Sequence, residues 1–75
     1  MRASDRNATA LAAICRRLDR HEPRATDAEG FKNLVEGAAA AGQIRRLARA
    51  AARLYAPAGR RIADYLHQGR LGGAA

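Results

Sequence analysis

The sequence is poor in the residues that build strands and large cores. Leu, Ile, Val and Phe together supply 12 of its 75 residues, Val and Phe occur once each, and Trp is absent. Because Val, Ile and Thr are few and scattered, there is little material for β-strands. So few large apolar side chains beside a net charge of +7 are also typical of disordered chains. The length allows one small domain, 1–75, and makes a large buried catalytic cleft improbable.

Cysteine is nearly absent, which excludes an intramolecular disulfide and speaks against a cysteine-based zinc site. The one cysteine, Cys15, has apolar neighbours and is expected to be buried. His21 and His67 lie far apart, and no carboxylate stands at ligand spacing on the same helical face. No glycine-rich loop follows a strand pattern, so nothing predicts a phosphate-binding loop. We therefore expect no metal, no cofactor and no enzymatic activity.

Long apolar runs are also missing, so no transmembrane helix is predicted. The absence of disulfides and of a leader sequence favours a reducing, cytoplasmic setting. An arginine-rich helix can lie on an anionic membrane, but this chain lacks Trp and has thin apolar faces. No membrane contact is expected.

What the sequence does contain is alanine and arginine, 20 and 13 residues respectively, at helical spacing. We predict an all-α bundle of four short helices with no β-sheet, and mobile ends at 1–4 and 69–75. Alanine-rich faces bury little area, so a homodimer is expected to complete the core. The predicted helices span residues 5–20, 26–41, 43–56 and 58 to 67 or 68.

Local signals set these boundaries. Ser4 is a candidate N-cap, and the spacing of Thr26 and Glu29 fits a capping box. Gly42 is the natural end of the second helix, although glycine's cost of about 1 kcal/mol leaves open a continuous helix through it. The sequence around Pro57 predicts a turn, and Gly69 is expected to follow the last helix.

Each helix has one apolar face. Phe31 is the expected core anchor of the second helix. In the third, the apolar arc includes Leu47, Ala51 and Leu54. The opposite arc, about 100° wide at 100° per residue, carries only arginine: Arg45, Arg46, Arg49 and Arg53.

Basic charge is concentrated in the C-terminal part of the chain. Residues 1–25 carry six Arg and three acids, a net +3; residues 26–42 carry one Lys and three acids, a net −2; residues 43–75 carry seven Arg and one acid, a net +6. Arginine donates forked hydrogen bonds that suit phosphate, and neutralising phosphates releases counterions. The pattern favours a nucleic-acid-binding accessory or regulatory protein, acting on DNA in preference to RNA, through these residues: Arg45, Arg46, Arg49, Arg53, Arg60 and Arg61.

Two alternatives remain open. In the first, the arginines only face solvent and bind no partner, and their number reflects a codon composition that favours arginine over lysine. Codon composition does not, however, explain a twofold excess of basic over acidic residues. The arginines can also dock on an acidic surface of a larger protein, as inhibitors or adaptors from phages and other mobile elements do.

A helix-turn-helix is a weaker prediction. The third and fourth helices, joined by a turn over 56–59, come closest to it, with Arg60, Arg61 and Asp64 at the start of the second helix of the pair. The second and third helices have too short a turn for the usual motif, if they are separate.

Overall fold

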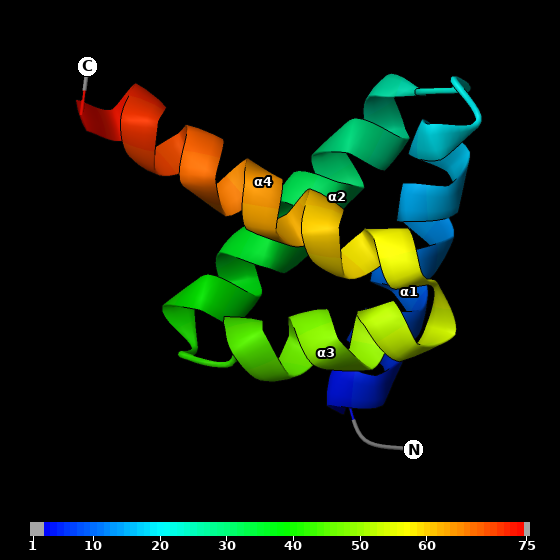
Figure 1. Cartoon of the computed structure of the whole chain (residues 1–75), viewed down its shortest axis with the longest axis horizontal. Coiled ribbons are helices and arrows are strands. Elements are labelled where there is room, and N and C mark those ends of the chain that lie inside the picture. The colour runs from blue at the N-terminus through cyan, green and yellow to red at the C-terminus, as the bar shows by residue number, and fades with distance from the viewer. Residues whose placement is uncertain (1–2, 75) are drawn as a thin grey trace.

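Four helices follow one another along the chain and point in clearly different directions (Figure 1). The computed structural model describes residues 3–74, with side chains from 4 to 68. The helices are α1 (Ala3–Asp19), α2 (Ala25–Ala40), α3 (Ile44–Leu54) and α4 (Ala56–Ala74). The predicted all-α fold is confirmed, since the described residues contain no strand. Of the ends expected to be mobile, 1–4 and 69–75, residues 1, 2 and 75 lie outside the described part, whereas residues 3, 4 and 69–74 belong to α1 and α4.

All four helices contribute to one core. α1 packs against the other three helices, and α3 packs against α4. Cys15 and Phe31 are buried as predicted. Five of the buried residues are alanines, so the helix backbones approach one another closely where they cross. The buried set comprises Ala8, Leu11, Ala12, Cys15, Phe31, Val35, Ala38, Leu47, Ala51, Ala58 and Ile62.

Although the composition is typical of disordered chains, the dimensions of the structure are those of a folded chain. The radius of gyration is 11.6 Å, close to about 11 Å for a folded chain of this length and far below about 27 Å for an unfolded one. The few large apolar residues suffice because most of them lie on the inner side of a helix.

The first two helices end in the same way. His21 (φ 57°) and Gly42 (φ 71°) adopt the left-handed conformation. After α2, the Gly42 N–H donates to the Ala39 carbonyl at 3.0 Å, and the Gln43 N–H donates to the Ala38 carbonyl at 2.9 Å. This pair of bonds is a Schellman motif, which satisfies carbonyls that the helix leaves unpaired. α2 and α3 are therefore separate helices joined by three residues.

The predicted capping box is wrong. α2 begins at Ala25, its N-cap residue is Arg24, and no side chain caps it. Since Thr26 lies inside the first turn, its hydroxyl is displaced from the capping position. Asp27, in the same turn, accepts a hydrogen bond from Arg17 of α1 instead.

Two predictions about the C-terminal part are also wrong. α3 and α4 are joined by Tyr55 alone, since Pro57 fits within the first turn of α4, where a missing N–H is tolerated. The three-to-four-residue turn of a helix-turn-helix is therefore absent between them. α4 also continues through Gly69, Gly72 and Gly73 to Ala74, so Gly69 does not end it, although each glycine costs a helix about 1 kcal/mol.

Leu54 was assigned to the apolar face of α3, but its relative exposure is 53%. It is the last residue of that helix and lines a hollow with Ala8 and Thr9 of α1. Those side chains are too short to cover it.

Candidate nucleic-acid interface

The outer face of α3 carries the arginines that the sequence singled out. Arg45, Arg46, Arg49 and Arg53 are all exposed, and we call them the α3 arginine row. At 100° per residue they occupy an arc of about 100°, and their span from 45 to 53 is about 12 Å along the helix axis. No other residue of α3 falls within this arc.

The opposite side of α3 fixes the direction in which the row points. Leu47 and Ala51 are buried, at 3% and 0% exposure. On the α4 side the helices are so close that a Cβ built on Gly59 lies 3.0 Å from Ala52 Cβ. α1 contacts α3 as well. Since both neighbours hold α3, its arginine row faces away from the core.

The row has a local excess of positive charge. α3 contains no acidic residue, and no member of the row forms an ion pair with any other residue of the described chain. A shallow surface hollow runs along it, lined by Gly42, Ala52 and the four arginines. Asp5 of α1 lies at the edge, where it lines a second hollow with Arg46 and Arg53.

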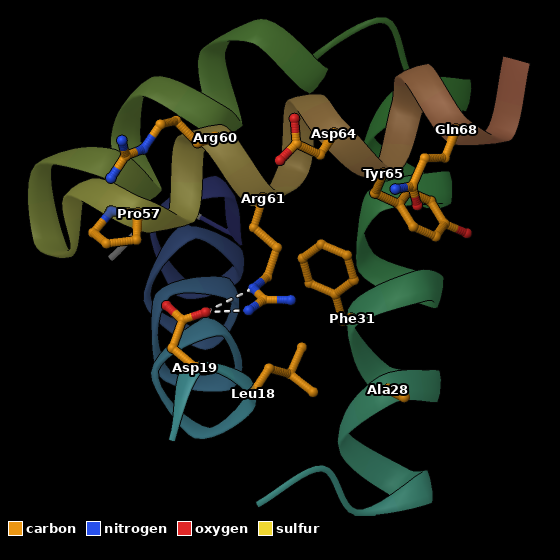
Figure 2. Close-up of a pocket in the computed structure, with 10 residues that line it drawn as sticks. All are labelled: Leu18, Asp19, Ala28, Phe31, Pro57, Arg60, Arg61, Asp64, Tyr65 and Gln68. Atoms are coloured by element: carbon orange, nitrogen blue, oxygen red, sulfur yellow. Dashed lines mark hydrogen bonds and ion pairs between the residues drawn. The ribbon is translucent and has the colours of Figure 1, made fainter. Parts of the chain in front are cut away.

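The other two predicted site residues lie elsewhere. Arg60 and Arg61 line a cleft between α1, α2 and α4, which shares no lining residue with the hollow along the row. Arg60 is exposed, whereas Arg61 reaches across the cleft to Asp19 of α1 (Figure 2). The Arg61 side chain is thus partly exposed, at 38%, and is ion-paired within the fold.

Asp19 joins α1 to α4 and to Tyr55, the residue between α3 and α4. Its Oδ1 accepts hydrogen bonds from Arg61 Nε, at 3.0 Å, and from Arg61 Nη2. Its Oδ2 accepts one from the Tyr55 hydroxyl at 2.7 Å. The bonds from Arg61 and then Tyr55 lower the pKa of the Asp19 carboxyl. The same contact with Asp19 raises the pKa of the Tyr55 hydroxyl. We call these three residues the Asp19 cluster.

Sequence reasoning did not single out Asp19. One signal was present: the carboxylate lies at the C-terminal end of a helix, where the macrodipole disfavours negative charge. An acid in that place needs a compensating cation. Which of the 13 arginines supplies it depends on the crossing of α1 and α4, which the sequence does not reveal.

Cys15 lies near the Asp19 cluster and is fully buried. Burial raises the pKa of its thiol to about 11. The thiol is therefore protonated at neutral pH, and the thiolate needed for nucleophilic chemistry is scarce.

Phe31 and Tyr65 close the other side of the cleft. Their rings pack edge to face, with centroids 5.4 Å apart and planes at 88°. The Tyr65 hydroxyl donates to Glu36 Oε1 at 3.2 Å, so this acid of α2 is directed toward α4.

The described residues hold no cluster of three or more potential metal ligands. Within the same part of the chain, none of the helices is long and apolar enough to cross a membrane. No protein-family model matches the chain, and comparisons with curated proteins and with solved structures give no significant match.

Proposed function

We propose that this protein is a small nucleic-acid-binding accessory or regulatory protein that contacts phosphates through the α3 arginine row. One observation carries the proposal: four exposed arginines share a 100° arc of one helix and have no carboxylate partner among the described residues.

The physical basis is electrostatic. Phosphates follow one another along a nucleic-acid backbone at a spacing of several ångströms, so a row of about 12 Å can neutralise two or three of them. Each neutralised phosphate releases condensed counterions, which favours binding at low salt. The guanidinium group adds paired donors that match two phosphate oxygens.

Codon composition alone does not account for this arrangement. Arg17 and Arg61 have an aspartate partner in the described chain, and exposed arginines outside the row such as Arg20 and Arg24 have none, so the row is distinguished by its concentration on one helix face. α3 has four arginines and no acid over 11 residues. Like charges at i, i+3 and i, i+4 destabilise a helix, so the row weakens α3 unless an anionic partner is bound.

The test compares two variants of equal charge. In the row variant, the four row arginines are replaced by Gln. In the control variant, Arg6, Arg20, Arg24 and Lys32, which are exposed residues of α1, the α1–α2 loop and α2, are replaced by Gln. Each variant lowers the net charge from +7 to +3.

Fluorescence anisotropy with labelled duplex DNA, single-stranded DNA and an RNA hairpin measures the result. We expect the row variant to lose about a hundredfold in affinity at low salt and the control variant at most a few-fold. Equal losses would show that net charge alone causes retention. If the unaltered protein bound none of the three probes, the proposal would be wrong.

An acidic protein surface is the second candidate partner. The observation that favours it is Leu54, which lies on the other side of α3 but is half exposed and lines a hollow with Arg53, so it offers an apolar anchor next to one arginine of the row. A pull-down from a nuclease-treated lysate tests this candidate. Stoichiometric capture of one acidic protein, lost in the row variant and in Leu54→Ser, would support it over nucleic acid.

A further inference from the structure

The turn between α2 and α3 has the length and the conformation of a helix-turn-helix connection. Ala41, Gly42 and Gln43 join the helices, and Gly42 has φ 71°. Turns of three to four residues, often with glycine, connect the two helices of that motif. The expectation that this pair has too short a turn is therefore wrong, because α2 ends at Ala40 and leaves three residues for the connection.

The arrangement of the helices fits as well. From the lower end of α2, α3 runs off in a new direction and does not fold back along α2 (Figure 1). α1 contacts both helices. Phe31 and Val35 of α2 and Leu47 of α3 belong to the same core as Leu11 of α1. The pair is thus held as a rigid unit, and the outer face of its second helix carries the row.

The chain that leads into α3 is built of small and uncharged residues. The residues 39–43 are exposed and consist of three alanines, one glycine and one glutamine. Glu36, the acid nearest to α3 along the chain, is hydrogen-bonded to Tyr65 of α4. A groove wall can therefore approach over residues 39–43 without meeting a carboxylate among them, and the acid beside the row is Asp5 of α1, which shares a hollow with Arg46 and Arg53.

Helix dimensions then suggest the partner. A helix with its side chains is about 10–12 Å wide, and the major groove of B-form DNA is about 12 Å wide. The major groove of A-form RNA is too narrow and deep to admit side chains for reading. Resting on the nucleic-acid-binding function proposed above, we infer that α2, the 41–43 turn and α3 form a helix-turn-helix that places α3 in the major groove of duplex DNA.

In this placement the arginines of the row have different roles. At 100° per residue, Arg49 lies closest to the centre of the arc, while Arg45 and Arg46 lie at its two edges. The central side chain reaches the base edges, where an arginine pairs with guanine O6 and N7. The edge arginines contact phosphates on the two walls of the groove.

The decisive experiment uses duplexes of one GC-containing sequence. One is unmodified DNA, one carries glucosylated 5-hydroxymethylcytosine, whose sugar fills the major groove, and one is the RNA duplex. Netropsin, added to an AT-containing duplex, occupies the minor groove. We expect glucosylation and the RNA duplex each to reduce affinity at least about tenfold, and netropsin to change it less than about twofold.

The outcomes separate this inference from the proposed function. Equal binding to plain and glucosylated DNA, competition by netropsin, or equal or tighter binding to RNA would overturn major-groove docking and leave nucleic-acid binding intact. If the unmodified duplex, single-stranded DNA and RNA all failed to bind, the proposed function itself would fail and the inference with it.

A conservative substitution tests the role of Arg49. Arg49→Lys keeps the charge and removes the forked donor. We therefore expect it to reduce the preference for guanine-containing over 7-deazaguanine-substituted duplexes, which lack the major-groove N7 acceptor, about fivefold or more and to keep the salt dependence. Arg45→Lys is the matched control and should leave that preference unchanged. Equal effects of the two substitutions would contradict the central position of Arg49.

Discussion

Two groups of arginines in this small molecule have opposite relations to acidic residues. Arg61 and Arg17 each pair with an aspartate of another helix, so their charge ties helices together. The α3 arginine row has no such partner in the described chain and lies on a helix without acids. The first arrangement contributes to folding. The second weakens α3 slightly and leaves four charges for an external anion, which is why we assign function to the row.

Removing the Asp19 carboxylate should have the largest effect on stability. Asp19→Ala leaves Arg61 and Tyr55 without their acceptor. Hydrogen bonds to a charged group contribute about 1.5–3 kcal/mol, and partial exposure reduces this, so we expect a loss of about 2 kcal/mol in the free energy of unfolding, measured by urea denaturation. Nucleic-acid affinity at a temperature where the variant is folded should not change. A loss of affinity without a loss of stability would reverse the roles of the two groups.

The Asp19 cluster also predicts a pH dependence. The pKa of its carboxyl lies below the ordinary value of 3.8 in the folded protein. Its stabilising contribution is therefore complete above the pKa of the unfolded chain and is lost as pH falls through the lower, folded pKa.

Comparing the unaltered protein with Asp19→Asn between neutral pH and about pH 2 measures this contribution. The difference in unfolding free energy should be constant near neutrality and shrink as the pH falls below the ordinary carboxyl pKa. A constant difference across the whole range would contradict the assignment.

The contact between α3 and α4 gives the next effect. Gly59→Ala places a Cβ 3.0 Å from Ala52 Cβ, and such overpacking outweighs the gain in helix propensity, with a net loss of about 1 kcal/mol. Gly37→Ala is the matched control in α2, because nothing lies within 4 Å of its new Cβ. It should stabilise the protein by about 0.5–1 kcal/mol. If both substitutions stabilised the protein, α3 and α4 would be packed less closely than the structure indicates.

The smallest effect concerns repulsion within the row. Neighbours three or four residues apart repel by about 0.2–0.5 kcal/mol per pair at low salt. The row variant should therefore be more stable than the unaltered protein by about 0.5–1 kcal/mol at low salt, with the advantage decreasing as salt screens the charges. Thermal melts at two salt concentrations measure this, and a row variant that is less stable at low salt would mean that the arginines have partners within the fold.

The sequence predicted the features that depend on helical periodicity. The four helices, the burial of Cys15 and Phe31 and the exposed arginine arc of α3 all follow from residue spacing. Gly42 marked the natural end of the second helix, but the sequence left a continuous helix through it open. The prediction failed where the answer depends on how helices cross. Thr26 fits a capping box locally, but α2 begins two residues too early to use it, since its N-cap is Arg24. Leu54 has an apolar position, but its neighbours on α1 are too short to cover it.

The same limit applies to the site. Arg60 and Arg61 are adjacent in sequence and were predicted to act with the row. Only the crossing of α4 over α1 reveals that Arg61 faces Asp19. Similarly, the connection between α2 and α3 was judged too short because the last turn of α2 was assumed to reach Ala41, whereas the Schellman turn ends α2 at Ala40.

The salt dependence of binding to duplex DNA tests the central claim most directly. The logarithm of the association constant should fall linearly with the logarithm of salt concentration, with a slope of about −2 to −3 if the row neutralises two or three phosphates. The row variant should retain a slope of about −1 or shallower, while the control variant of equal charge should keep that of the unaltered protein. Equal slopes for the two variants would contradict the account, because the phosphate contacts would then not be made by α3.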